Sequence, residues 1–509
     1  MNTRERLTVL KNAFANVVRG GAAALVAIAL PPFLTRLMLP DAFGAWSLVL
    51  QLSAFVGYLD FGIQTAIGRF VAHTGESGDS KHRDRIVNTS FAALASAGAL
   101  GVAGCVGLAL LLPRIFHQIP AALLHDSRWA LVLVGSSLAI GLPCSVFNGI
   151  FVGLQRYEIP AAVIGGSRLL SAALLVFIVK QGGSLTAMAA AVAVVNLFSY
   201  ALQYLLYRKL TPSVNFRRDL ISKAAGRELF DYCLSLSIWS FATLLVTGLD
   251  IALVGYFDFR SVAYYAAAAT LITFILGLQN ALFTAMIPAA AVLEARRDTS
   301  ELGRTLLSTS RYGMFILLAS GVPLLLATRP ILTVWVGPDY AAHASLILQV
   351  LVVANIIRLS AVPYAMLLIG TGQQRLVTIS PLLEGFSNLA ISLIVGALLG
   401  AVGVAIGTLV GAIVGIAANF VYNLPRSTRI AASRMLYFRD GYLRPAVCVS
   451  PVLLLFPLRH LFSNDGASVA LVALLALMLT WTIGLSASER ERIGIWLRIA
   501  PAIRASARP

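Results

Sequence analysis

The sequence predicts an all-α, polytopic membrane protein of about 14 transmembrane helices, and three observations support this prediction. Hydrophobic residues make up 58% of the 509 residues, whereas Asp, Glu, Lys and Arg together make up 12%, about half their share in soluble domains. The mean hydropathy is +0.84. Apolar stretches of about 20 residues, the length that crosses a bilayer, recur along the whole chain.

Charged and turn-forming residues separate these stretches into spans. We expect the spans at approximately 13–38, 43–70, 88–112, 129–154, 159–179, 184–206, 229–257, 262–292, 311–334, 342–369, 376–399, 401–424, 442–462 and 467–486. The first apolar segment is too long for a cleaved signal peptide and has no clear cleavage site, so we expect it to remain as the first span.

The positive charges predict the orientation of the spans. Of the 39 Lys and Arg residues, 29 lie on the same side as the N-terminus, seven lie on the other side, and Arg19, Arg168 and Arg358 lie within spans. Because Lys and Arg are enriched in cytoplasmic loops, we expect both termini in the cytoplasm. The net charge of +17 therefore reflects topology, and we expect no nucleic-acid partner.

The loops argue against an enzyme. The longest cytoplasmic connection, near residues 207–228, is too short to fold into a catalytic domain. The sequence contains no P-loop, no HExxH motif and no cluster of His and Cys. The four Cys residues all fall inside apolar runs and resemble small core residues. We therefore predict no catalytic residues, no metal site and no cofactor.

An internal repeat predicts the domain organisation. Trp46 and Tyr265 occupy similar contexts 219 residues apart, and Arg156 and Arg375 have the same separation. An even number of spans in each half makes this a parallel repeat, an architecture found among alternating-access transporters. The predicted parts are an N-terminal six-helix lobe (1–207), a basic linker (208–228), a second six-helix lobe (229–425), two additional spans (426–486) and a basic tail (487–509). The tail is either an amphipathic segment on the membrane or disordered.

Arginine residues inside spans suggest a binding site for an anion. Arg358 lies near the centre of the tenth span, where an arginine costs roughly 3 kcal/mol on insertion scales. Its planar guanidinium suits phosphate, although a structural ion pair is the alternative. Arg19 and Arg168 lie about two turns inside their spans, so each either joins such a cavity or extends to the cytoplasmic interface.

Three acidic residues inside spans predict a second kind of site. Asp60 and Asp250 lie well inside their spans, and Glu384 lies in the cytoplasmic third of the eleventh. Intramembrane carboxylates commonly carry protons, bind cations or pair with arginines. We predict coupling or gating roles for them, with H⁺ and Na⁺ both left open. Arg69 does not pair with Asp60, because nine residues along one helix span roughly 13 Å.

The segments "LDFGIQTAIGRFVA", "GLQRYEIP" and "LDIALVGYFDFRSVAYYAAAATL" resemble the polysaccharide biosynthesis, or oligosaccharide flippase, family of the multidrug/oligosaccharidyl-lipid/polysaccharide exporter superfamily, over residues 10–425. This resemblance implies a V-shaped bundle of two six-helix lobes in the bacterial inner (cytoplasmic) membrane. It also implies that a polyprenyl-diphosphate-linked oligosaccharide crosses to the outer leaflet for O-antigen or exopolysaccharide synthesis. The implied partners are this lipid, membrane lipids and polysaccharide polymerase or assembly proteins.

The resemblance implies that arginines in a central cavity bind the diphosphate. Arg19 and Arg358 match this expectation by residue type and location, and Arg168 is a further candidate. A total of 14 spans is also similar to the peptidoglycan-precursor flippase branch. That branch has a cluster of arginines in its first span, whereas this sequence has only Arg19 there, so we do not assign the chain to that branch. Two other functions stay open. A multidrug-type exporter would favour an acidic cavity, against which the three arginines argue, and a non-transporting scaffold would use the charges to recruit partners.

Overall fold

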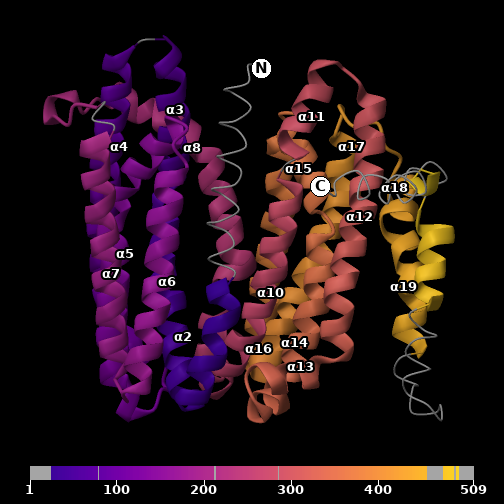
Figure 1. Ribbon diagram of the computed structural model, residues 1–509, viewed down its shortest axis with the longest axis horizontal. Helices are drawn as coiled ribbons and strands as arrows, with labels where there is room; N and C mark the ends of the chain where they lie inside the picture. Colours follow the sequence, from indigo (N-terminus) through magenta and orange to yellow (C-terminus); the bar gives the residue numbers. More distant parts are fainter. Residues whose placement is uncertain are drawn as a thin grey trace, which may run out of the picture. The chain divides into compact units, whose positions relative to one another are not determined.

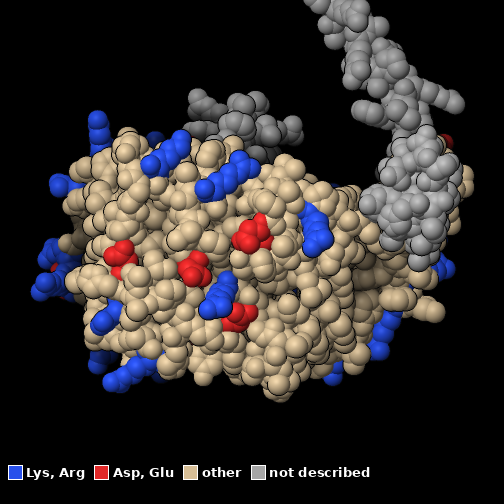
Figure 2. All heavy atoms as spheres, turned by 90° about the horizontal axis from the view of Figure 1, so that it is seen from below, with Lys and Arg blue, Asp and Glu red and all other residues tan. Residues whose placement is uncertain are grey.

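The computed structural model describes residues 25–77, 79–210, 214–284, 286–455, 474–485 and 489–491. Within these ranges every regular element is a helix and none is a strand (Figure 1). This confirms the all-α prediction. Figure 2 shows one face of the molecule, on which Lys, Arg, Asp and Glu side chains are separated by uncharged surface, as the low content of charged residues predicts.

Nine helices in the described ranges are long and apolar enough to cross a membrane. They are Pro40–Thr74, Ser80–Ile115, Ala121–Gly153, Glu158–Lys180, Leu185–Leu210, Phe259–Gly277, Thr299–Leu326, Pro338–Gly370 and Thr378–Arg426. A bent pair, Lys223–Leu234 and Leu236–Gly248, forms a tenth when counted as one span with a 46° bend. The protein is therefore a multi-pass membrane protein. The count of 14 stays a prediction, since residues 1–24 and 456–473 lie outside the described ranges.

The chain divides into two compact units. Unit 1 comprises Met1–Ala281, Arg329–Asn355 and Val377–Ala418, and unit 2 comprises Leu282–Thr328, Ile356–Leu376 and Asn419–Pro509. These units group residues by spatial contact, whereas the predicted lobes group them by internal repeat. The predicted lobe boundaries therefore stay a prediction.

In unit 1, α5 packs against six other elements of the first group, namely α2, η1, α3, α4, α6 and α7. The elements of this group are the helix Leu25–Leu37, α2 (Pro40–Ala54), η1 (Phe55–Asp60), α3 (Ile63–Ser77), α4 (Ser80–Ile115), α5 (Ala121–Gly153), α6 (Glu158–Lys180) and α7 (Leu185–Leu210). Small residues allow close packing between membrane helices. A β-carbon at Gly98 would lie 2.6 Å from the carbonyl oxygen of Ala139.

The rest of unit 1 contains a broken span and a tight hairpin. Its elements are η2 (Arg218–Leu220), α8 (Lys223–Thr243), the π-helix η3 (Leu244–Gly248), α9 (Asp250–Phe257), η4 (Phe259–Ser261), most of α10 (Val262–Phe283), α13 (Thr328–Trp335), most of α14 (Pro338–Leu359) and most of α16 (Gln374–Ala418). Within α16, Gly400 has φ 58° and ψ −133°, a conformation that is unfavourable for residues with a side chain. The chain reverses there and makes two helices, as predicted for spans 376–399 and 401–424.

The two arms of α16 pack through a stripe of glycines. Gly403, Gly407, Gly411 and Gly415 recur every fourth residue on the second arm. Positions for their β-carbons would lie 2.0–2.9 Å from atoms of residues 395, 392, 388 and 384 on the first arm. This arrangement is the small-residue packing typical of membrane helices. It brings the polar residues of the first arm against the second arm.

Unit 2 contains the ends of several spans and the last helices of the chain. Its elements are α11 (Met286–Ala295), α12 (Thr299–Leu326), α15 (Val362–Gly370), η5 (Asn419–Asn423), α17 (Leu424–Arg426), α18 (Arg434–Phe438), η6 (Arg439–Leu443), α19 (Arg444–Leu455) and η8 (Thr480–Gly484). An ion pair joins Arg311 on α12 to Glu489, and both side chains are largely shielded from solvent. This ion pair joins residues 489–491 to α12.

Each unit contains a close glycine contact between two helices. In unit 1, a β-carbon at Gly153 of α5 would lie 2.7 Å from the carbonyl oxygen of Gly68 on α3. In unit 2, a β-carbon at Gly370 of α15 would lie 2.6 Å from the carbonyl oxygen of Ile287 on α11. Gly68 and Ile287 are 219 residues apart, whereas Gly153 and Gly370 are 217 residues apart. The internal repeat stays a prediction.

Candidate functional site

Three of the charged residues predicted to act within the membrane lie at breaks in their spans. Asp60 is the last residue of η1, immediately before the turn that leads to α3. Asp250 is the first residue of α9, after the π-helix η3. Arg358 lies in the last turn of α14, before a short turn that leads to α15. Broken helices are tolerated in membranes where they are buried in protein or line a cavity, and transporters use them to bind substrates and ions.

The break beside Asp60 depends on a left-handed turn. Phe61 has φ 49° and Gly62 has φ 78°. A β-carbon at Gly62 would lie 2.7 Å from the β-carbon of Leu236 on α8, so glycine is required both for the turn and for the contact. The Ser237 hydroxyl donates to the carbonyl oxygen of Phe61 at 3.3 Å. Helix α8 therefore stabilises the break.

Two side chains from other helices hold the break beside Asp250. Gln51 on α2 donates its amide to the carbonyl oxygen of Gly248 at 2.5 Å. Asn388 on α16 donates to the carbonyl oxygens of Val246 at 3.0 Å and Leu245 at 3.4 Å. These bonds satisfy backbone carbonyls in the π-helical part of the span, which would be costly to bury without donors. The break is therefore supported from both sides.

Asp250 belongs to a buried polar cluster, the α9–α16 cluster, which we define as Asp250, Asn388, Ser392 and Thr408. The Asn388 amide nitrogen lies 3.4 Å from Oδ1 of Asp250. The Ser392 hydroxyl donates to Asn388 Oδ1 at 2.9 Å. Ser392 and Thr408 each contact the carbonyl oxygen of Val404 at 3.3 Å. All four cluster residues are at least 92% buried.

The chemistry of this cluster suits a small cation or a proton. It contains one carboxylate, one amide oxygen, two hydroxyl oxygens and a backbone carbonyl, and oxygen atoms are the preferred ligands of hard cations. Among the described residues, no three His, Cys, Asp or Glu side chains gather as a metal site. A single carboxylate with neutral oxygens balances one positive charge.

Glu384 lies on the same arm of α16, one turn before Asn388, and is 8% exposed. Its carboxylate approaches the second arm so closely that a β-carbon at Gly415 would lie 2.6 Å from Oε2. Asp250 contacts Asn388 on α16, and Glu384 lies one turn before Asn388 on the same helix. The structure thus places these two predicted coupling residues near each other along α16. Their coupling roles stay a prediction.

Replacing Gly407 with alanine should separate the two arms of α16 and disturb the α9–α16 cluster. The new β-carbon would lie 2.0 Å from the Ser392 hydroxyl and 2.8 Å from its backbone nitrogen, so rotation of the side chain alone does not relieve the clash. Overpacking of this kind costs about 1–3 kcal/mol. We expect a lower thermal unfolding temperature of the purified protein. The matched control is Gly166→Ala, because no atom lies within 4 Å of a β-carbon there; equal unfolding temperatures for the two variants would contradict the predicted packing.

Arg358 is partly buried, and it lies at the carboxyl end of α14. The unpaired carbonyls at a helix C-terminus carry partial negative charge, which stabilises a cation there. The following turn is held by Ser360, whose hydroxyl donates to the carbonyl oxygen of Ile357 at 2.6 Å and lies 3.4 Å from the hydroxyl of Tyr442. Arg358 therefore lies beside a break in a 33-residue span.

The other two arginines are less closely defined. Arg168 is exposed on α6, and its neighbours Leu169 and Leu170 are 45% and 46% exposed. Arg19 lies outside the described residues. The assignment of Arg19, Arg168 and Arg358 to a diphosphate-binding cavity stays a prediction.

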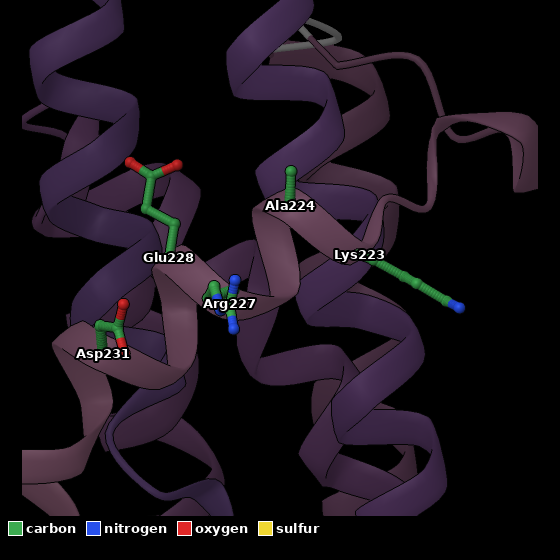
Figure 3. A pocket seen from close by; sticks show the side chains of 5 residues that line it. All are labelled: Lys223, Ala224, Arg227, Glu228 and Asp231. Atoms are coloured by element: carbon green, nitrogen blue, oxygen red, sulfur yellow. The ribbon is translucent and has the colours of Figure 1, made fainter.

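A surface depression at the start of α8 carries charged residues but does not form a convergent site. Lys223, Arg227, Glu228 and Asp231 line it with Ala224 (Figure 3). All five come from neighbouring turns of one helix and are exposed. Lys223 points away from Glu228 and Asp231 (Figure 3). We therefore interpret it as a solvated helix face.

Asn388, Ser392 and Thr408 were not among the residues that the sequence singled out. A signal for the first two was present, because Glu384, Asn388 and Ser392 recur every fourth residue in an apolar span. Residues four apart lie on one face of a helix, so this spacing indicates a polar stripe. Thr408 lies in the next span, and its place in the cluster follows from the hairpin at Gly400.

Comparison with solved structures identifies the fold. The lipid II flippase MurJ, in an inward closed conformation, superposes with a TM-score of 0.72 over 92% of this chain and 98% of that chain, at 12% identity. An outward-facing multidrug resistance MATE family transporter of the MOP superfamily superposes with a TM-score of 0.58 over 84% and 96%, at 15% identity. These similarities show that the chain has the fold of these transporters.

Sequence comparison identifies the family. The uncharacterized membrane protein EpsK of Bacillus subtilis (strain 168) is 23% identical over 394 residues, which cover 75% of this chain and 76% of EpsK. Residues 9–294, more than half of the chain, match the family described as polysaccharide biosynthesis protein. The chain therefore belongs to the polysaccharide biosynthesis protein family.

Proposed function

We propose that this protein is a flippase that moves a polyprenyl-diphosphate-linked oligosaccharide from the cytoplasmic to the outer leaflet of a bacterial inner membrane. The observation that carries the proposal is membership of the polysaccharide biosynthesis family over residues 9–294. The likeness in fold to a lipid II flippase over 92% of the chain supports it. Both termini would then be cytoplasmic, in agreement with the distribution of Lys and Arg.

The proposed substrate separates into an apolar and an anionic part. The polyprenyl tail stays in the lipid, while the sugars and the diphosphate cross along a polar path. Arg358 would bind the diphosphate through its guanidinium fork, which forms paired hydrogen bonds to phosphate oxygens. With the cytoplasm negative, outward movement of each negative charge is favoured by about 2.3 kcal/mol per 100 mV. The membrane potential would therefore assist the transfer.

Return of the empty protein is a second step, in which the positively charged site and any bound cation move inward with the same potential. We propose that Na⁺ or H⁺ binds at Asp250 in the α9–α16 cluster, with Glu384 close by on the same arm of α16. Binding there neutralises a buried carboxylate and stabilises one arrangement of the broken span. Release on the other side would favour the alternative arrangement.

The proposed flippase supplies a surface polymer, either an O-antigen or an exopolysaccharide. Its product is a lipid-linked oligosaccharide in the outer leaflet, which a polymerase or assembly protein must consume. We therefore propose polysaccharide polymerase or assembly proteins as its partners, together with membrane lipids.

Loss of the protein should cause its lipid-linked substrate to accumulate. We expect mass spectrometry of lipid extracts to show one polyprenyl-diphosphate oligosaccharide several-fold enriched in host cells that lack the protein, with the surface polymer missing. Re-expression of the wild-type chain should reverse both changes. An unchanged lipid pool with unchanged surface polymer would refute the proposal.

The likeness to a MATE transporter favours a second candidate function, that of a small-molecule exporter. This function predicts instead that cells without the protein become more sensitive to cationic compounds.

A further inference from the structure

A pocket of unit 1 that carries several polar side chains shares no lining residue with the α9–α16 cluster. It has a volume of about 350 Å³ and is formed by α2, η1, α3, α5 and α7. Asp60 and Gln64 line it at the break in the second span, Ser145 and Asn148 line it from α5, and Gln203 lines it from α7. Five polar side chains from three spans therefore converge on one space.

Several of these side chains present oxygen atoms that lack donors. Asp60 Oδ1, Asn148 Oδ1 and Gln203 Oε1 are buried and have no hydrogen-bond partner in the described part of the chain. Asn148 is 8% exposed and Gln203 is 1% exposed. The Gln203 amide nitrogen already donates to Ser199 at 3.4 Å, which leaves its oxygen as the free group. Buried acceptors without donors are costly, so this pocket is suited to a ligand that supplies donors.

The dimensions and charge of the pocket restrict that ligand. Ligand pockets commonly measure roughly 300–1,000 Å³, whereas one water in the liquid occupies about 30 Å³. The space is therefore too large for a bare ion. None of the described residues that line it is Lys, Arg or His, and one is a carboxylate, so a phosphate or a diphosphate would be repelled. The apolar side chains of Leu138 and Leu142 and the ring of Tyr200 also line the pocket.

We propose that this pocket binds a neutral, hydroxyl-rich sugar ring. Sugar hydroxyls would donate to Asp60, Asn148 and Gln203, and the C–H face of the ring would pack against Leu142 and Tyr200. This proposal rests on the proposed flippase function and deepens it, because it assigns the sugar part of the substrate to unit 1. The protein would then recognise the sugar by acceptor oxygens and the diphosphate by an arginine, with different residues for each.

The proposal is tested with purified, full-length protein in detergent. The probes are methyl glycosides of glucose, galactose, mannose and N-acetylglucosamine, and binding is measured by saturation-transfer NMR. We expect at least one of these neutral glycosides to bind, and we expect methyl glucuronide and inorganic diphosphate not to displace it, because the pocket carries a carboxylate and no cation. Gln203→Met keeps the shape of the side chain and removes the acceptor, and we expect it to weaken binding about tenfold or more.

Control variants separate the pocket from the rest of the protein. Asp60→Asn should also weaken binding, whereas Arg329→Gln, at an exposed residue of α13, should bind the glycoside as the wild type does. Thermal unfolding identifies any variant that loses binding because it does not fold. The proposal is overturned when no neutral glycoside binds the wild type, when both Gln203→Met and Asp60→Asn bind normally, or when methylammonium binds in place of the glycosides.

A measurement in cells distinguishes failure of this proposal from failure of the flippase function. In cells that carry Gln203→Met, we expect the lipid-linked oligosaccharide to accumulate as it does without the protein. Normal surface polymer with Gln203→Met, together with accumulation in the absence of the protein, would reject the sugar site and retain the flippase. No accumulation in either case would reject the flippase function itself.

Discussion

Replacing Arg358 with glutamine should reduce flipping of the lipid-linked oligosaccharide by about 30-fold or more while leaving membrane insertion intact. The arginine is partly buried at the carboxyl end of α14, where it would bind a diphosphate in a desolvated site. Removing one partner of such a charge pair costs about 2–5 kcal/mol, and about 1.4 kcal/mol corresponds to a tenfold change in rate. Glutamine keeps a hydrogen-bond donor but loses the charge and the paired geometry.

The measurement is the amount of surface polymer and of accumulated lipid-linked oligosaccharide in cells that carry only the variant. Arg329→Gln is the matched control, because it makes the same change at an arginine that is exposed on α13 and has no predicted role. Arg358→Lys should give an intermediate rate, since lysine keeps the charge but not the planar fork. Full activity of Arg358→Gln at wild-type protein levels would exclude this arginine from the mechanism.

Much of the fold could be predicted from the sequence because the bilayer requires long apolar helices. The hairpin at Gly400 illustrates this. Two apolar stretches meet at that residue, and the predicted spans 376–399 and 401–424 coincide with the two arms of α16.

The breaks inside the spans could not be predicted in the same way. The segment 229–257 is predominantly apolar, with Asp231 and Asp250 as its charged residues, yet it contains the π-helix η3 and a new helix that begins at Asp250. The carbonyl oxygens of this break are bonded by Gln51 and Asn388, which lie about 200 and 140 residues away in the chain. Tertiary contacts therefore decide where the span breaks, and a local hydropathy pattern does not contain them.

The charged residues of the candidate sites were predicted from the sequence, whereas the neutral polar residues were not. A carboxylate or guanidinium inside an apolar span is costly and therefore conspicuous, and this is why Asp60, Asp250 and Arg358 were recognised. Neutral polar residues are common in membrane helices and attract less attention. Asn148 and Gln203 lie on different spans, and only the packing of α5 against α7 brings them to the pocket beside Asp60.

Replacing Asp250 with asparagine should abolish the response of the protein to its coupling ion. A ligand that binds only the folded state stabilises it by about 2.7 kcal/mol when present at 100 times its dissociation constant. If the ion is Na⁺, we therefore expect the unfolding temperature of the purified wild type to rise when Na⁺ replaces choline at constant ionic strength. If the ion is H⁺, we expect the unfolding temperature to change with pH and not with Na⁺. In Asp250→Asn neither change should remain, because asparagine carries no charge to balance.

The second intramembrane acid provides the control that makes this prediction specific. Asp60 lies at a similar helix break, but its neighbours form the open pocket of unit 1, whereas Asp250 contacts the Asn388 amide nitrogen at 3.4 Å and Asn388 Oδ1 accepts from Ser392 at 2.9 Å. Asp60→Asn should therefore keep the ion response, and Ser392→Ala, which removes one hydroxyl of the α9–α16 cluster, should weaken it. An ion response that survives in Asp250→Asn but disappears in Asp60→Asn would reverse the two assignments, with the cation bound in unit 1's pocket and the cluster at Asp250 serving only to hold the broken span.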